Sequence, residues 1–115
     1  MQRDLLLVGE MVEAAEQIQQ LVDGVTLDEL LVDRQRRDAL LWNFTVLGEA
    51  AVQVSAGVRE RFSAVSWQQP QRLRNRIVHG YWSIDLEILH TTATLQLPGF
   101  ADELRRVLAI LERDS

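Results

Sequence analysis

The sequence has no cysteine, no lysine and no long apolar run. Without cysteine, the chain can form no disulfide, no thiolate zinc site and no cysteine nucleophile. None of its apolar runs reaches the length of a membrane-crossing helix or of the core of a secretion signal. We therefore expect a cytoplasmic protein that neither spans a membrane nor is exported.

Positive charge is the scarcer sign, because the chain has 12 basic and 17 acidic residues and a net charge of -5. An acidic protein of this kind is not suited to broad, salt-driven binding of duplex nucleic acid. All the basic residues are arginines, however, and several of them lie close together with Glu60 as the only acid among them. These are Arg59, Arg61, Arg72, Arg74 and Arg76. The sequence thus predicts a local positive patch, and arginine suits phosphate well.

The length and the hydrophobic spacing predict one all-α domain over residues 1–115. With 115 residues, 47% of them hydrophobic, the chain can fill a single core. Apolar residues recur at intervals of three and four, whereas alternation typical of strands is absent. We expect an antiparallel bundle of four to five helices. The predicted helical ranges are 3–23, 27–31 (a single short turn), 34–56, 67–79, 84–97 and 99–113.

Capping residues place the ends of these helices. Thr26 and Glu29 have the spacing of a capping box. We expect residues 57–66 to form a connection, Gly80 to end the fourth range as a left-handed cap, and Pro98 to separate the last two ranges. Gly24 is expected to end the first helix, and the expected N-caps of later helices are Asp33, Ser66 and Ser83.

His79 is the strongest candidate for chemistry. Only His79 and His90 have a side chain whose ordinary pKa lies near neutrality. Arg72, Arg74 and Arg76 occupy the two turns before His79, and an imidazole among guanidinium groups can bind a phosphodiester and move the proton of a 2′-hydroxyl. The alternative is a histidine that only caps a helix end, beside arginines that only keep the surface hydrated. His90 is expected to be a packing or surface residue.

Other polar residues give weaker signals. Asp85, Glu87 and His90 are close in sequence, but their spacing is common by chance, so we expect neither a metal site nor a cofactor. Gly48 lies in the 34–56 range, where close helix packing is the ordinary explanation for a glycine. Glu49 either faces solvent or pairs with an arginine of the 67–79 helix and holds that helix in register.

The segment Arg74-Asn75-Arg76-Ile77-Val78-His79-Gly80-Tyr81 resembles the signature of the HepT group of HEPN-type ribonuclease toxins. That signature is an arginine, four intervening residues, a histidine, one residue and a tyrosine. The similarity extends over essentially the whole chain, through Leu47-Gly48-Glu49-Ala50, Trp67, Trp82, Asp85 and Leu97-Pro98.

The resemblance implies a homodimeric, metal-independent endoribonuclease that acts on RNA, with transfer RNA as one candidate. It implies the toxin of a type VII-like toxin–antitoxin pair, whose partner is a minimal nucleotidyltransferase antitoxin. In this family pattern, Arg74 stabilises the phosphate in the transition state and His79 is the general base or acid. The alternative is a non-enzymatic dimer that serves only as a partner and modification substrate of the nucleotidyltransferase.

The same resemblance assigns supporting roles to nearby residues. Asn75 would orient the phosphate or the histidine, and Tyr81 matches the tyrosine that related antitoxins modify with adenylate groups. Arg72 and Arg76 are expected to add contacts to the substrate.

The angle between Arg74 and His79 bears on how the site is assembled. Arg74 and His79 are five residues apart, so on an ideal helix their side chains point about 140° away from each other around the axis. Asn75 and His79, in contrast, share a face. Distortion of the helix end at Gly80 or the length of the arginine could close the gap. A two-fold dimer that joins two motif-bearing helices would close it more easily.

Overall fold

The computed structural model describes residues 2–115, and every regular element in that range is a helix. The all-α prediction is therefore confirmed, without a strand in the described part of the chain. The long helices are α1 (Gln2–Val22), α3 (Arg34–Gln53), α5 (Gln68–Gly80) and α7 (Leu97–Asp114). The short elements are α2 (Leu27–Val32), α4 (Ala56–Arg61), the 3-10 turn η1 (Tyr81–Ser83), α6 (Leu86–Thr91) and the π-helical segment η2 (Thr92–Gln96).

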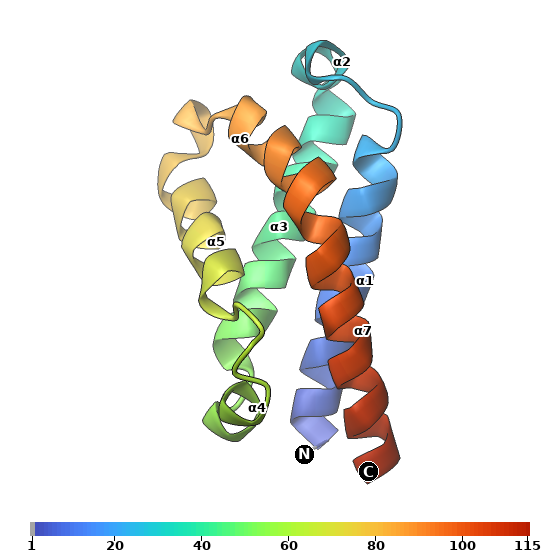
Figure 1. Ribbon diagram of the computed structural model, residues 1–115. Coiled ribbons are helices and arrows are strands. Elements are labelled where there is room, and N and C mark those ends of the chain that lie inside the picture. The colour runs from blue at the N-terminus through green and yellow to red at the C-terminus, as the bar shows by residue number, and fades with distance from the viewer. Residues whose placement is uncertain (1) are drawn as a thin grey trace.

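Helix α1 packs between α3 and α7, and α5 packs against the other side of α3 (Figure 1). The two chain ends lie at the same end of the bundle, next to α4. The core is formed by apolar side chains that α1, α3 and α7 turn toward one another. Its fully buried members include Val8, Met11, Ile18, Leu40, Phe44, Leu47 and Leu104. Among residues 2–115, no helix is long and apolar enough to cross a membrane.

The capping predictions for the N-terminal half are confirmed. Gly24 ends α1 with a φ of 67°, which is the left-handed region that glycine tolerates best. The amide of Glu29 donates to the hydroxyl oxygen of Thr26 at 3.1 Å, and the amide of Thr26 donates to the Glu29 carboxylate at 3.0 Å. Asp33 caps α3 by accepting from the amide of Arg36 at 3.1 Å.

The expected connection over residues 57–66 was partly wrong, because α4 occupies Ala56–Arg61. Ser55 caps α4 by accepting from the amide of Val58 at 3.3 Å. The amide and the hydroxyl of Ser55 both donate to the carboxylate of Asp4, each at 2.8 Å. Asp4 is only 6% exposed, so a buried acid at the start of α1 fixes the start of α4. That contact joins residues 51 positions apart, and local spacing could not predict it.

Both predicted boundaries of the motif helix differ from the structure. Ser66 is not the N-cap; Trp67 holds that position without a side-chain cap, and its indole N–H instead donates to the carbonyl of Phe62 at 3.0 Å. Pro70 falls in the first turn, as expected. Gly80 is not left-handed, because its φ is -143°. The helix therefore includes Gly80 and passes directly into η1.

The last two predicted helices are joined by η2 into one bent rod. Asp85, and not Ser83, caps α6 by accepting from the amide of Glu87 at 2.9 Å. Pro98 does not separate two helices. Its missing N–H and bulky ring disrupt the usual bonding with the preceding turn, and the helix widens so that the amide of Leu97 donates to the carbonyl of Thr92, five residues back.

Candidate active site

Helix α5 lies very close to α3 at Gly48. A Cβ atom placed on Gly48 would collide with the carbonyl oxygen of Pro70 and with the Cβ of Arg74. Both of these atoms are held by the α5 backbone, so neither can move aside independently. The prediction that Gly48 serves close helix packing is confirmed, and the packing fixes where Arg74 leaves its helix.

Arg74 is held by two polar contacts along the seam between α3 and α5. Its Nη2 lies 2.6 Å from Oε2 of Glu49, and its Nη1 donates to Oδ1 of Asn75 at 2.7 Å. Glu49 thus forms the ion pair that was one of its two expected roles. The Nε of Arg74 is buried and finds no hydrogen-bond partner within residues 2–115. The guanidinium group is therefore oriented, and one of its donors remains unused.

His79 lies on an exposed part of α5. No hydrogen bond or ion pair links its ring to another residue of the described range. Residues 74 to 79 all lie inside α5, which continues to Gly80, so no distortion of the helix end turns His79 toward Arg74. The separation of about 140° around α5 therefore remains, and no hydrogen bond joins the two side chains within residues 2–115. Asn75 shares a face with His79 and contacts Arg74, so it lies between them.

Arg72 and Arg76 share the face of α5 on which His79 lies. Both side chains are exposed, and neither pairs with a carboxylate of residues 2–115. Arg72 donates only to the amide oxygen of Gln68, at 3.2 Å. Of the five arginines of the predicted patch, Arg61 pairs with Asp114 and Arg74 with Glu49. The patch on α5 is therefore smaller than predicted, because only Arg72 and Arg76 have no acidic partner there among residues 2–115.

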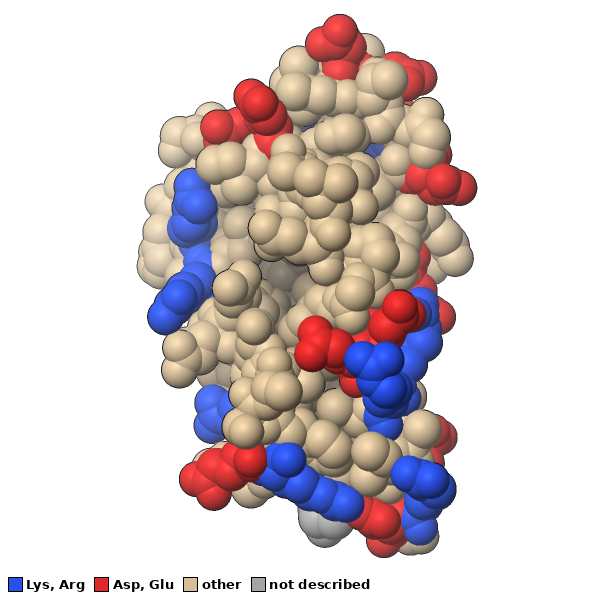
Figure 2. All heavy atoms as spheres, in the orientation of Figure 1, with Lys and Arg blue, Asp and Glu red and all other residues tan. Residues whose placement is uncertain are grey.

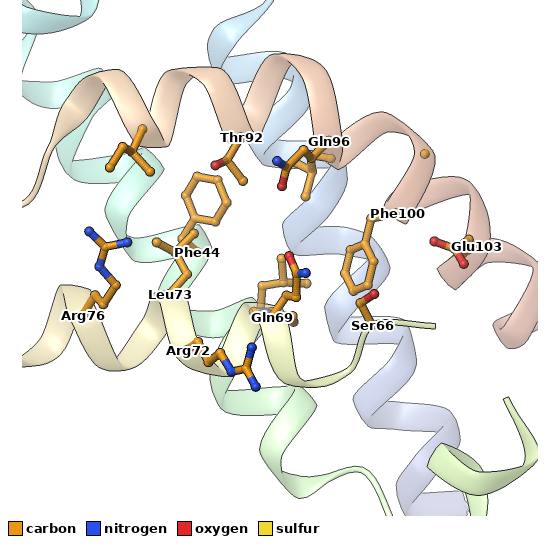
Figure 3. Close-up of a pocket in the computed structure, with 15 residues that line it drawn as sticks. Phe44, Ser66, Gln69, Arg72, Leu73, Arg76, Thr92, Gln96, Phe100 and Glu103 are labelled. Carbon is orange, nitrogen blue, oxygen red and sulfur yellow. The ribbon is translucent and has the colours of Figure 1, made fainter. Parts of the chain in front are cut away.

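A cleft of about 590 Å³ borders this basic face. It lies between α5 and the η2–α7 rod, over Phe44 and Leu47 of α3 (Figure 3). In the space-filling view the cleft is a hollow among uncharged side chains, with basic groups on the α5 side and both acidic and basic groups on the α7 side (Figure 2). The two arginines of the cleft wall are Arg72 and Arg76. Sequence reasoning did not predict this cleft, because the bend at η2 shapes one of its walls.

Tyr81 is anchored to α3 by its hydroxyl group, which donates to Oδ1 of Asp38 at 2.8 Å. This hydrogen bond, together with partial burial and the negative charge of Asp38, raises the pKa of Tyr81 above its ordinary value. The phenol ring also meets Trp82 edge to face, with 5.4 Å between the ring centres. Tyr81 still exposes 40% of its surface, so its hydroxyl lies at the surface but is not free. Sequence reasoning missed Asp38, which lies 43 positions away.

Large apolar side chains are exposed beside the motif. Trp42 follows Asp38 by four residues and precedes Glu49 by seven, so it lies on the stripe of α3 that contacts Tyr81 and Arg74. It is 67% exposed. Val78 and Trp82 are exposed to 50% and 95%. Trp42, Val78 and Trp82 are called the apolar rim below. Sequence reasoning singled out neither Trp42 nor Val78 for function.

The second histidine has a structural contact. The Nε2 of His90 lies 2.7 Å from the carbonyl oxygen of Val25, so α6 is tied to the loop before α2. Asp85 is occupied with capping α6. Within residues 2–115, no three histidine, aspartate or glutamate side chains are grouped closely enough to hold a metal ion.

Comparison with known proteins gives a consistent set of matches. A family model described as "Ribonuclease HepT-like" matches residues 11–107. A "Putative RNase" of Methanocaldococcus jannaschii is 24% identical over 103 residues, which cover 90% of this chain and 85% of that protein. A "Probable ribonuclease HepT" of Thermococcus cleftensis is 19% identical over 98 residues, which cover 85% and 89%. No solved structure matches the chain significantly.

Proposed function

Because this chain belongs to the HepT-like ribonuclease family, we propose that it is an endoribonuclease that cuts single-stranded or looped RNA without a metal ion. The observation that carries the proposal is the placement of His79. Its ring is exposed, is not engaged by another described side chain, and shares a helix face with two unneutralised arginines, Arg72 and Arg76. A cationic surface with an accessible base is the combination that phosphodiester cleavage requires.

In the proposed reaction His79 accepts the proton of a ribose 2′-hydroxyl group. The 2′-oxygen attacks the adjacent phosphorus, and the bond from phosphorus to the 5′-oxygen of the next nucleotide breaks. A proton delivered to that 5′-oxygen completes the step, which leaves a 2′,3′-cyclic phosphate and a free 5′-hydroxyl. Arg74 stabilises the negative charge that builds on the phosphate oxygens, and Asn75 orients the group.

We propose that the site is completed by a second copy of the chain. Arg74 points along the α3–α5 seam and His79 lies about 140° away around α5, so one chain does not aim both at one phosphate. A two-fold axis beside α5 would bring Arg74 of one protomer toward His79 of the other. The apolar rim supports this arrangement, because three large apolar side chains beside the motif would be covered in such a dimer.

The direct test is cleavage of total RNA by purified protein in the presence of a chelator. His79→Ala and Arg74→Ala should each lose about two to three orders of magnitude in rate, as is usual when one charge-stabilising group is removed. Arg113→Ala is the matched control, because Arg113 is an exposed arginine in the last turn of α7 and does not line the cleft. A need for added divalent metal would contradict the metal-free reaction. Parent-like cleavage by both motif variants would contradict the assigned centre.

A mixed dimer tests the shared site. Differently tagged Arg74→Ala and His79→Ala chains are co-expressed, and the heterodimer is purified. It retains one intact arginine and one intact histidine on opposite chains, so cleavage should partly return. A heterodimer as inactive as its parents would favour a site built within one chain.

We further propose that the protein is the toxin of a type VII-like pair and that its nucleotidyltransferase partner silences it at Tyr81. The phenol oxygen would attack the α-phosphorus of ATP, pyrophosphate would leave, and Asp38 is placed to accept the phenol proton. Adenylate groups would place negative charge and bulk beside the basic face of α5. Intact mass after incubation with the partner and ATP should show additions that are missing in Tyr81→Phe.

The second candidate function is a non-enzymatic dimer that is only a partner and modification substrate of the nucleotidyltransferase. The net charge of -5 favours this non-enzymatic function, because a ribonuclease with this charge would have to draw its RNA affinity from one small basic surface. Adenylate addition at Tyr81 together with unchanged RNA in the cleavage assay would support this alternative.

A further inference from the structure

Resting on the proposed ribonuclease function, we propose that the cleft between α5 and the η2–α7 rod binds an unstacked base of the RNA substrate. The cleft would hold a nucleotide that flanks the cleaved phosphate and so contribute to the choice of cleavage site. Three features of the cleft favour such a ligand: its lining, its charge and its continuity with the stripe of α5 that carries His79.

The lining combines flat apolar surface with amide groups. Phe44 and Leu47 form the floor, and Phe100 stands on the α7 side. In Figure 3, Gln69 lies between the two phenylalanine rings, and Gln96 approaches from the opposite wall. The partly exposed ring of Phe100 can stack on a nucleobase, whereas Phe44 is only 2% exposed and lies in the floor. Amides both donate to and accept from base edges. Both amides are exposed and neither bonds to another side chain of residues 2–115, so each can meet the edge of a planar polar ring.

The charges of the cleft are divided between its two sides. Arg72 and Arg76 form the α5 wall, whereas the only carboxylate in the lining, Glu103, lies on α7. Neither arginine is neutralised by an acid of the described residues. A ligand that fits this division carries an anionic group toward α5 and a neutral polar ring inside the cleft. A nucleotide within a strand of RNA has this form.

The basic wall of the cleft continues along α5 toward His79, the proposed general base. His79 follows Arg72 by seven residues and Arg76 by three, so the three side chains form one stripe of α5 about 10 Å long. Phosphates that lie along this stripe would present one ribose to His79 while a neighbouring base enters the cleft. The surface of α5 therefore offers one path for the RNA backbone, with a cavity for a base beside it.

Gly99 makes the cleft testable without removing any of its side chains. It lines the cleft, and a Cβ at this position would meet no atom within 4 Å. Gly99→Phe should therefore fill the cleft without straining the helix. Gly9 is a matched control, because it is also helical, its Cβ would also meet no atom within 4 Å, and it does not line the cleft.

Both variants are made in a His79→Ala background, so that a labelled single-stranded RNA of mixed sequence is bound but not cut. Its affinity is measured by fluorescence anisotropy, and the side-chain amide signals of Gln69 and Gln96 are followed by NMR. Gly99→Phe should weaken binding by about tenfold or more, the usual effect of losing a stacked base. Gly9→Phe should bind like its parent, and RNA should shift both amide signals.

Equal affinity in the two variants would overturn the proposal, as would RNA that shifts neither amide. A change in oligomeric state caused by Gly99→Phe alone would also overturn it, because the cleft would then be an interface between copies. Cleavage by protein with an intact His79 separates a failure of the base site from a failure of the proposed ribonuclease function. If Gly99→Phe with an intact His79 cuts RNA at the parental rate and positions, only the base site is wrong. If the parent neither binds nor cuts RNA, the proposed function fails as well.

Discussion

Gly48→Ala should weaken the protein, although alanine is the better residue in a helix. The gain in helix propensity is about 0.5 to 1 kcal/mol. The new methyl group, however, would overlap the carbonyl oxygen of Pro70 and the Cβ of Arg74, which are both fixed to the α5 backbone. Overpacking of this kind costs about 1 to 3 kcal/mol. We therefore expect a net loss of about 1 kcal/mol in the free energy of unfolding, within a range of about 0 to 2.5 kcal/mol.

Urea denaturation measures this difference, and Gly9→Ala is the matched control. A methyl group at Gly9 meets no atom within 4 Å, so only the gain in propensity remains and the control should be slightly stabilised. The two alanine variants should thus shift the urea midpoint in opposite directions with little change in slope. If Gly48→Ala is as stable as Gly9→Ala, the close approach of α5 to α3 is refuted.

The same substitution should affect cleavage more than stability. To relieve the overlap, α5 must move away from α3, and the ion pair between Arg74 and Glu49 would lengthen with it. A displacement of this kind misplaces the arginine relative to the phosphate, and small errors in position cost large factors in rate. Gly9→Ala should cleave RNA like the parent protein.

Three further predictions concern contacts at the ends of the helices and along the α3–α5 seam. The raised pKa of Tyr81 means that its hydrogen bond to Asp38 stabilises the fold fully below about pH 10 and that this stabilisation is lost as the pH rises through the folded-state pKa. The stability difference between the parent and Tyr81→Phe should therefore shrink above about pH 10. Urea midpoints at several pH values measure this difference. Asp4→Ala leaves the amide and the hydroxyl of Ser55 without their acceptor. It should lower the free energy of unfolding by about 1 to 3 kcal/mol and speed amide hydrogen exchange in α4. Asp4→Asn should recover part of the lost stability. Glu49→Gln removes a half-exposed ion pair and should lower the free energy of unfolding by only about 1 kcal/mol or less. It should raise the free-energy barrier to RNA cleavage by more than this amount, because Arg74 loses its fixed orientation. Equal, small changes in both free energies would refute that role of Glu49.

Local signals predicted much of the fold. The helical periodicity, the capping box at Thr26 and Glu29 and the cap at Asp33 depend on residues within one or two turns, and the structure has all of them. Gly48 and Glu49 were also informative, because a glycine beside an acid in an apolar helix suggested a close neighbour with a basic group. The features that the sequence concealed depend on distant partners. The start of α4 requires Asp4, and the anchoring of Tyr81 requires Asp38.

The candidate site was predictable as a set of residues but not as a geometry. The motif supplied Arg74, Asn75, His79 and Tyr81, and the helical angle separated Arg74 from His79. Gly80, however, was expected to be left-handed, and the chain instead continues in a right-handed turn that brings Tyr81 back to α3. A glycine permits a left-handed conformation but does not require it.

The π-helical segment also explains an irregularity in the spacing of the core residues. Leu89, Ala93, Leu97 and Ala101 are all buried and recur every four residues. In an uninterrupted α-helix that spacing would rotate the last side chain about 120° away from the first. The wider turn at η2 absorbs one residue and reduces the offset to about 20°, so a single stripe serves both α6 and α7. The rod thus carries one residue more than its core needs. A relative that lacks one residue between positions 92 and 96 would keep the same buried face on a regular helix, and the gap in a comparison of the two sequences belongs inside this helix and not in a loop.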